Sequence, residues 1–256
     1  DRGELLLLPA ANPDWAIFYA SQVGEEGTVR VNVQTYADAE VIKAADKVIV
    51  LAEEIVPESY LRLEPEKNIA AGYAINYLIK LPWAAHPTGS QGFYDVDADF
   101  IRTFYRASKS QETFDRWADE WIFDIPDHER YLQKLGIGRL ENIRANPVLG
   151  YSTRQKRGTR KMAVNKLSVA AYSYSPMDLL AVAAAREVRD GDIVFTGTGL
   201  PMLAIMLAQH THAPNSVCIY EAGSIDGRPL DLPTSVGDAR CAYQSAVISG
   251  LTETLY

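Results

Sequence analysis

The sequence is poor in the residues that build disulfide frameworks and metal clusters. It contains two cysteines, Cys218 and Cys241, and four histidines in 256 residues. Disulfide scaffolds need more cysteines, so we expect two buried, inert thiols in a reducing compartment. His210 and His212 have no cysteine or carboxylate cluster at ligand spacing nearby, and we therefore assign no metal site.

Long apolar runs and an excess of positive charge are also missing. No run approaches the roughly 18 apolar residues that a membrane span needs. Lys and Arg number 25 against 33 Asp and Glu, and the net charge of −8 argues against a broad surface for nucleic acid or anionic lipid. We expect a cytoplasmic protein that works on small molecules, with neither nucleic acid nor membrane as a partner.

The sequence has ample material for a core, since 47% of its residues are hydrophobic. In the first third, β-rich runs alternate with a segment of helical spacing at Thr35–Ala45. The predicted strands are Trp15–Ala20, Val29–Val33, Lys47–Ala52 and Gly72–Lys80. This alternation is typical of an α/β fold.

After Asp95 the pattern changes to helices, with aromatic and aliphatic residues three and four positions apart. Such stripes indicate helix faces packed on a core. Periodicity is lost between Asn146 and Asn165, which predicts a linker. Ser175-Pro176 then predicts the start of a helix that runs to Arg189, because Ser is a favoured N-cap and Pro suits the first helical turn.

A strand, a glycine turn, a helix and a second strand follow one another near the C-terminal end. The strands are Asp192–Thr196 and Ser216–Tyr220, and the helix between them covers Met202–Gln209. A helical crossover joins parallel neighbours, so both strands should end at one sheet edge. Ligands bind at that edge in open parallel sheets. The edge would hold Glu221 and the turn Gly197-Thr198-Gly199.

Glu221 and the glycine turn have both chemical and structural interpretations. Glycine amides can approach a ligand closely and stabilise an oxyanion formed when a carboxylate attacks an acyl carbon. A Gly-x-Gly turn also occurs in phosphate-binding loops and in plain tight turns. A strand-end glutamate can equally be a structural carboxylate that caps a neighbouring helix.

The C-terminal part resembles the β subunit of class I CoA-transferases of the glutaconate CoA-transferase type. The motifs that carry the resemblance are Gly197-Thr198-Gly199-Leu200-Pro201, Ala213-Pro214, Glu221-Ala222-Gly223 and Ser235-Val236-Gly237-Asp238. The resemblance implies that Glu221 is the nucleophile of a ping-pong reaction through an acyl-glutamyl anhydride and a glutamyl-CoA thioester. It also implies an oxyanion and acyl pocket that includes Gly197, Thr198, Gly199 and Gly223. An acyl-CoA thioester and a carboxylic acid acceptor would be the substrates, with no permanently bound cofactor.

The first half resembles the later portion of the α subunit of the same family, in the stretches Ala45–Pro57, Ala84–Thr88 and Gly92–Asp95. We therefore expect an α-type segment at 1–145, a linker at 146–172 and a β-type segment at 173–256. The implied fold is the CoA-transferase fold, a largely parallel sheet flanked by helices, here with incomplete lobes. Incomplete lobes leave apolar surface to cover, so a homo-oligomer or a complementing subunit is expected.

Two points stay open from the sequence. His86, in His-Pro-Thr-Gly after a predicted strand, could line the acyl pocket or could be satisfied by backbone hydrogen bonds. Glu221 could instead serve as the general base of a CoA-thioester hydrolase. A third interpretation is a catalytically silent fragment that acts as an assembly module.

Overall fold

The chain folds into two compact units. The computed structural model describes residues 9–32, 34–154 and 174–255. Unit 1 is Asp1–Ala84 and unit 2 is Ala85–Tyr256. This division differs from the subunit-like division at residue 145 predicted from the resemblance, which stays a prediction. Residues 155–172 of the predicted linker lie outside the described part.

Unit 1 is built on a five-stranded sheet of order β4-β2-β1-β3-β5. The strands β1 (Trp15–Gly24), β3 (Lys47–Val56) and β5 (Tyr77–Lys80) are parallel. The short strands β2 (Val29–Arg30) and β4 (Asn68–Ala70) complete the sheet in antiparallel pairings. The predicted strands of β1 and β3 are confirmed and extend further, whereas β2 is shorter than its apolar run and β4 was not expected.

Alternation along β1 and β3 places one set of side chains in the core of unit 1. Ala16, Phe18 and Ala20 of β1 are buried together with Val48 and Val50 of β3. Ile17 of β1 points to the other face and is 72% exposed. The period of two thus separates a core face from an open face.

Short helices complete unit 1: α1 (Asp38–Ala44), α2 (Glu58–Leu61), η1 (Pro65–Lys67) and η2 (Gly72–Ala74). The predicted helix at Thr35–Ala45 is confirmed over its central part. The predicted strand at Gly72–Lys80 is wrong in its first half, where η2 stands. Gly72 packs so closely on Glu26 that a Cβ there would lie 1.8 Å from the Glu26 carbonyl oxygen, which an ordinary extended strand residue could not do.

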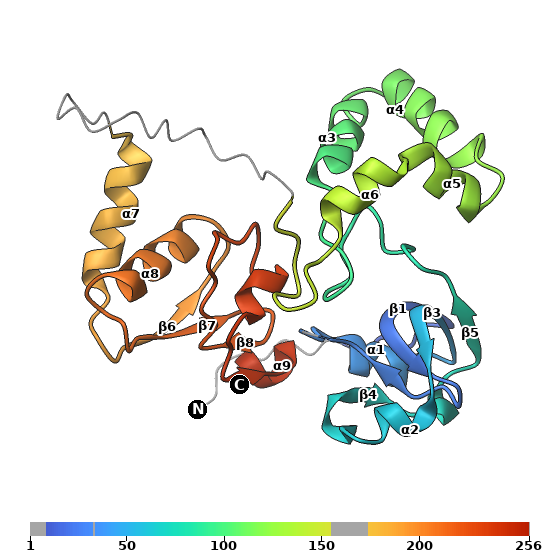
Figure 1. Cartoon of the computed structure of the whole chain (residues 1–256), viewed down its shortest axis with the longest axis horizontal. Coiled ribbons are helices and arrows are strands. Elements are labelled where there is room, and N and C mark those ends of the chain that lie inside the picture. Colours follow the sequence, from blue (N-terminus) through green and yellow to red (C-terminus); the bar gives the residue numbers. More distant parts are fainter. Residues whose placement is uncertain (1–8, 33, 155–173, 256) are drawn as a thin grey trace. The chain divides into compact units, whose positions relative to one another are not determined.

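Unit 2 begins with a group of helices, α3 (Ala98–Ala107), α4 (Gln111–Ala118), the π-helical turn η3 (Asp119–Phe123), α5 (His128–Leu135) and α6 (Ile137–Ile143), seen together in Figure 1. Their aromatic stripe packs inward as predicted. Phe100 meets Trp117 and Trp121 edge to face, with ring centroids 5.8 and 4.8 Å away. Such geometry is favoured between aromatic rings.

The remainder of unit 2 carries α7 (Pro176–Glu187), β6 (Ile193–Thr196), α8 (Leu200–His210), β7 (Val217–Tyr220), β8 (Ser224–Ile225), η4 (Ala239–Ala242), β9 (Val247–Ile248) and α9 (Leu251–Leu255). Helix α7 starts at the predicted cap: Ser175 and Asp178 form a capping box. It ends two residues before the predicted Arg189.

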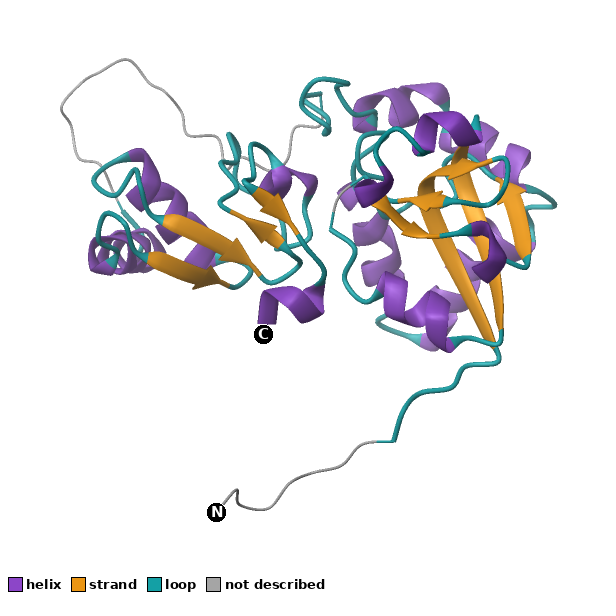
Figure 2. Ribbon diagram, turned by 90° about the horizontal axis from the view of Figure 1, so that it is seen from below, coloured by secondary structure: helices purple, strands orange, loops and turns teal. Residues whose placement is uncertain are grey.

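The four-stranded sheet of unit 2 has the order β6-β7-β8-β9. Strands β6 and β7 are parallel, as expected for a helical crossover, while β8 and β9 add antiparallel pairings. In both units the longest pairings are parallel and helices accompany the sheets (Figure 2), so the predicted α/β class is confirmed. The core beneath this sheet contains Met202, Ile205, Cys218, Tyr220 and Cys241.

Candidate active site at the edge of β6 and β7

The predicted site residues leave the sheet of unit 2 side by side. Thr196, the last residue of β6, is paired with Tyr220, the last residue of β7. Gly197 and Glu221 are the next residues along the two strands, so they emerge at the same carboxyl edge. Glu221 is exposed, and none of the described residues donates a hydrogen bond to its carboxylate. The helix-capping alternative therefore finds no support, and the carboxylate is open to a ligand.

The glycine turn is open and leads directly into α8. Gly199 is the N-cap of α8 with φ of 96°, a conformation that favours glycine. A Cβ placed on Gly197 would meet nothing within 4 Å, so solvent or a ligand can approach this backbone. The Thr198 hydroxyl oxygen accepts a hydrogen bond from the Val236 amide at 3.2 Å. The turn is thus accessible on one side and held on the other.

The loop after β7 is fixed by backbone hydrogen bonds around Gly223. Its amide donates to the Tyr220 carbonyl at 2.9 Å, and its carbonyl accepts from the Ser249 amide at 2.9 Å. Gly223 has φ of 113°, and a Cβ there would lie 1.9 Å from the Ser249 carbonyl oxygen. Gly223 is therefore required by the backbone, which positions Glu221 two residues before it.

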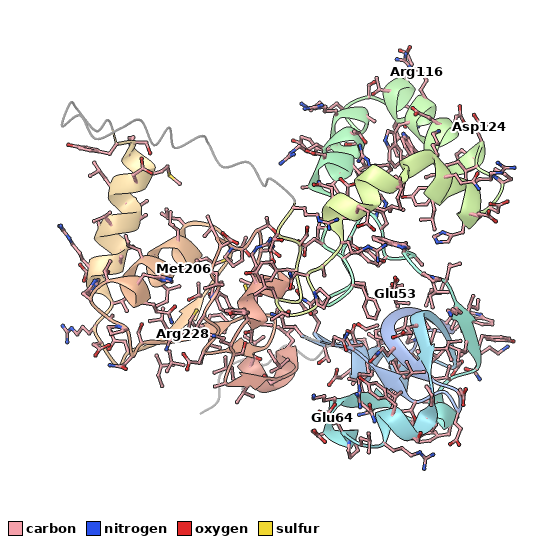
Figure 3. All side chains as sticks on the ribbon, in the orientation of Figure 1. Glu53, Glu64, Arg116, Asp124, Met206 and Arg228 are labelled. Atoms are coloured by element: carbon pink, nitrogen blue, oxygen red, sulfur yellow. The ribbon has the colours of Figure 1, made fainter. Side chains whose placement is uncertain are left out.

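Buried residues under this edge are kept neutral. Burial raises the pKa of Tyr220, and burial likewise raises the pKa of both Cys218 and Cys241 above the ordinary thiol range. The Cys218 thiol donates to the Thr196 hydroxyl at 3.2 Å. Both cysteines are buried free thiols, as predicted from the sequence. Arg228, labelled with Met206 of α8 in Figure 3, pairs with Asp226 at 2.8 Å beyond β8.

His86 sits in a polar network among the helices of unit 2. Its Nδ1 lies 2.6 Å from the Tyr131 hydroxyl and its Nε2 lies 3.2 Å from Oδ2 of Asp97, which also accepts from Arg139 at 3.0 Å. The imidazole is fully buried. Side chains, rather than the backbone groups considered from the sequence, thus engage both ring nitrogens. The placement of His86 in an acyl pocket stays a prediction.

Asp97 is the charged centre of that network. Burial alone would raise its pKa, but hydrogen bonds from His86, the Phe100 amide and Arg139, together with the charge of Arg139, lower the pKa to about 2. Tyr131 shows the opposite shift: burial, then the negative charge of Asp97, raises its pKa to about 12. No sequence pattern marks this cluster, because its members are separated by up to 45 positions.

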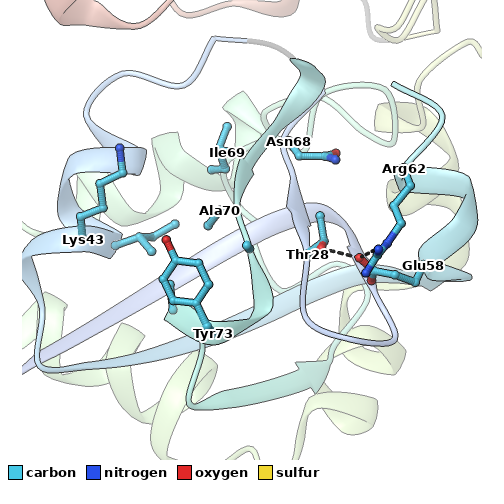
Figure 4. A pocket seen from close by; sticks show the side chains of 11 residues that line it. Thr28, Lys43, Glu58, Arg62, Asn68, Ile69, Ala70 and Tyr73 are labelled. Atoms are coloured by element: carbon cyan, nitrogen blue, oxygen red, sulfur yellow. Dashed lines mark hydrogen bonds and ion pairs between the residues drawn. The ribbon is translucent and has the colours of Figure 1, made fainter. Parts of the chain in front are cut away.

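A surface cavity of about 430 Å³ lies in unit 1, which contains none of the predicted site residues. Figure 4 shows Lys43 and Tyr73 on one side of it and Glu58 with Arg62 on the other. Glu58 accepts from the Thr28 hydroxyl and lies 3.6 Å from Arg62 Nε. Its polar groups are therefore already engaged within unit 1.

Metal-binding clusters and membrane-spanning helices are missing from the part of the chain that the structure describes. Within it, no group of three or more His, Cys, Asp or Glu side chains is placed to hold a metal ion. No helix in the described ranges is long and apolar enough to cross a membrane.

Comparison with known proteins points to one family. Residues 177–256 match the family model described as "Coenzyme A transferase". The chain is a relative of the class I CoA-transferases. Over 148 residues this CoA-transferase relative is 38% identical to one subunit of glutaconate CoA-transferase from Acidaminococcus fermentans, covering 58% of the chain and 46% of that subunit. Over 68 residues it is 37% identical to the other named subunit of the same enzyme, covering 27% of the chain and 26% of that protein.

A solved structure agrees with these matches. The crystal structure of glutaconate coenzyme A-transferase from A. fermentans superposes with a TM-score of 0.54 at 39% identity, covering 57% of this CoA-transferase relative and 46% of that chain. The chain therefore spans less than half the length of each of these curated relatives. Similarity to two different subunits of one enzyme is in line with the two resemblances read from the sequence.

Proposed function

We propose that the chain forms part of an acyl-CoA:carboxylate CoA-transferase in which Glu221 is the nucleophile. The observation that carries the proposal is the pairing of Thr196 with Tyr220, which brings Gly197 and Glu221 to one sheet edge. Exposure of Glu221 supports a role toward a ligand. The match of residues 177–256 to the CoA-transferase family supports the class of reaction.

The proposed reaction has two parts. The Glu221 carboxylate attacks the thioester carbonyl of acyl-CoA, the carbon–sulfur bond breaks, and the CoA thiolate leaves an acyl-glutamyl anhydride. The thiolate then attacks the glutamyl carbonyl, releasing the donor's carboxylate and forming a glutamyl-CoA thioester. The acceptor carboxylate repeats the steps in reverse order and leaves with CoA, which regenerates Glu221.

Each acyl transfer develops negative charge on a carbonyl oxygen. Preorganised amides stabilise such an oxyanion, and removing one donor typically costs 10²–10³-fold in rate, as an order of magnitude. In the proposal, the open backbone of Gly197, Thr198 and Gly199 supplies these donors, with Gly223 fixing the opposite loop. The acyl-CoA and the acceptor acid are the substrates, without a permanently bound cofactor.

The proposal includes a second protein chain or a second copy. The chain spans less than half the length of its curated relatives, which are named as subunits of an enzyme. Apolar residues of the open sheet face in unit 1, such as Ile17 at 72% and Tyr77 at 51% exposure, would gain from cover. Assembly with a copy or with a complementing subunit would provide it.

The test is intact-mass analysis of the chain after mixing with a panel of acyl-CoAs, followed by peptide mapping. A CoA-sized adduct on Glu221, lost in Glu221→Gln and retained in Glu112→Gln, is expected. Glu112 is an exposed glutamate on α4 that pairs with Arg116, so its substitution is a matched control.

Two other outcomes contradict the proposal in different ways. Thioester hydrolysis that depends on Glu221 but gives neither an adduct nor trapping by hydroxylamine or borohydride assigns Glu221 as a general base. Neither turnover nor CoA-ester binding, with oligomerisation preserved in Glu221→Ala, assigns the chain to an assembly role.

A further inference from the structure

The segment Thr234–Cys241, here called the anchor loop, closes on the carboxylate of Asp238. Oδ2 of Asp238 accepts from the amide and the hydroxyl of Thr234, both at 2.9 Å. Oδ1 accepts from the Arg240 amide at 3.1 Å and from Nη1 of Arg240 at 3.0 Å. The side chains of Asp238 and Arg240 are each 3% exposed. A buried carboxylate with this many donors holds the loop in one conformation.

One side of the anchor loop contacts both parts of the proposed site. The Val236 amide donates to the Thr198 hydroxyl of the glycine turn at 3.2 Å. The Ser224 hydroxyl, three residues beyond Glu221, donates to the Cys241 carbonyl. The anchor loop therefore bridges the turn after β6 and the loop after β7.

The other side is held by residues from the first part of unit 2. Nε2 of Gln91 donates to the Gly237 carbonyl at 3.2 Å. Nη2 of Arg240 donates to the Ser152 carbonyl at 3.3 Å and lies 3.6 Å from Oδ2 of Asp95.

Two further contacts fix the surroundings of the guanidinium. It lies 4.5 Å from the ring centre of Tyr151, a residue that is 1% exposed. Asp95 Oδ2 also accepts from the Ser152 amide at 2.9 Å. Since a buried charge that loses its partners is costly, the positions of Asp95 and Ser152 constrain where the anchor loop can sit.

We infer that Gln91 and Arg240 are positioning residues, which hold the glycine turn and the Glu221 loop in register through the anchor loop. The inference rests on the proposed role of Glu221 for its catalytic consequence. A misplacement of about 1 Å in a reacting group can cost 10²-fold in rate, so loosening this loop slows acyl transfer. The residues that resemble an α subunit thereby act on the nucleophile of the part that resembles a β subunit.

The first experiment compares Gln91→Ala with the matched control Gln133→Ala in the full chain. Gln133 forms its hydrogen bonds on the exposed surface of α5. Amide hydrogen exchange is followed in peptides that cover the anchor loop and the glycine turn. We expect Gln91→Ala to raise exchange there about tenfold, and Gln133→Ala to leave it unchanged. Unchanged exchange in Gln91→Ala overturns the inference.

The second readout is the rate of CoA-adduct formation on Glu221. We expect a 10- to 100-fold slower rate in Gln91→Ala at saturating acyl-CoA, with the half-saturating concentration unchanged, and a similar loss in Arg240→Lys. An unchanged rate in a variant whose loop exchange has risen overturns the positioning role. If the unmodified chain forms no adduct while Gln91→Ala still loosens both peptides, the proposed function fails and the mechanical coupling stands.

Discussion

Gly223 lies directly against Ser249, whose amide donates to its carbonyl at 2.9 Å and whose carbonyl oxygen stands where a Cβ would be placed. This contact joins the loop that carries Glu221 to the end of the sheet. It leaves no room for a side chain at position 223. Any larger residue must displace the backbone that positions Glu221.

Gly223→Ala is therefore expected to lower the free energy of unfolding by about 3 kcal/mol, since both the positive φ and the clash penalise a Cβ. Urea denaturation measures the loss. The control is Gly197→Ala, where a Cβ would meet nothing within 4 Å and a change below about 1 kcal/mol is expected. Equal stability of the two variants would contradict the close contact.

Asp97→Asn should destabilise unit 2 by roughly 3 kcal/mol at neutral pH, because it leaves the buried His86 and Arg139 groups without their carboxylate. Chemical denaturation followed by the fluorescence of Trp117 and Trp121 reports on these helices. Asp99→Asn is the control: Asp99 is 76% exposed and pairs only locally with Arg102 among its described ion pairs. A loss in Asp99→Asn as large as in Asp97→Asn would refute the assignment.

The stability of unit 2 should also depend on acid in a defined window. The pKa of Asp97 is lowered from 3.8 to about 2, so its stabilising contribution is complete above about pH 4 and is lost as the pH falls through about 2. The shift corresponds to about 2 kcal/mol. Urea midpoints measured between pH 5 and pH 2 should fall for the unmodified chain and fall less for Asp97→Asn.

Asp38 at the start of α1 predicts the opposite slope in unit 1. Burial, then repulsion from Glu40, raises its pKa to about 6. The folded state favours the protonated form, so this contribution is complete below about pH 4 and is lost as the pH rises through about 6.

Asp38→Asn is accordingly expected to stabilise unit 1 at pH 7 by about 1 kcal/mol, after discounting for the partial exposure of Asp38. At pH 3.5 the substitution should have little effect. Denaturation curves at the two pH values, compared with those of Asp46→Asn as a second aspartate of unit 1, give the measurement. A stability gain of the same size at pH 3.5 would argue against titration of Asp38 as the cause.

Local signals were sufficient where the chain is locally self-consistent. The apolar runs on either side of Gly197, Thr198 and Gly199 predicted β6, α8 and β7 and their parallel pairing, because a short crossover leaves few alternatives. Ser175-Pro176 predicted the start of α7 for the same reason. The position of Glu221 at a sheet edge followed from that topology.

Features that depend on distant contacts could not be predicted. The bend at Gly72 results from its approach to Glu26, 46 positions earlier in the chain, and the apolar sequence around it is compatible with a strand. The partners of His86 come from α5 and from the turn before α3. Gln91 and Arg240 meet the anchor loop and its neighbours across residues that have no regular spacing, so no periodic pattern marks them.

The two units have separate cores, and this separation has a thermodynamic consequence. In the described part of the chain, the core around β1 and β3 shares no residue with the cores around α8 and β7. Each unit can therefore melt as its own cooperative transition, and a single melting temperature would average two processes. Trp15 and Trp83 report on one transition and Trp117 and Trp121 on the other, which makes the chain a natural pair of internal calorimetric references.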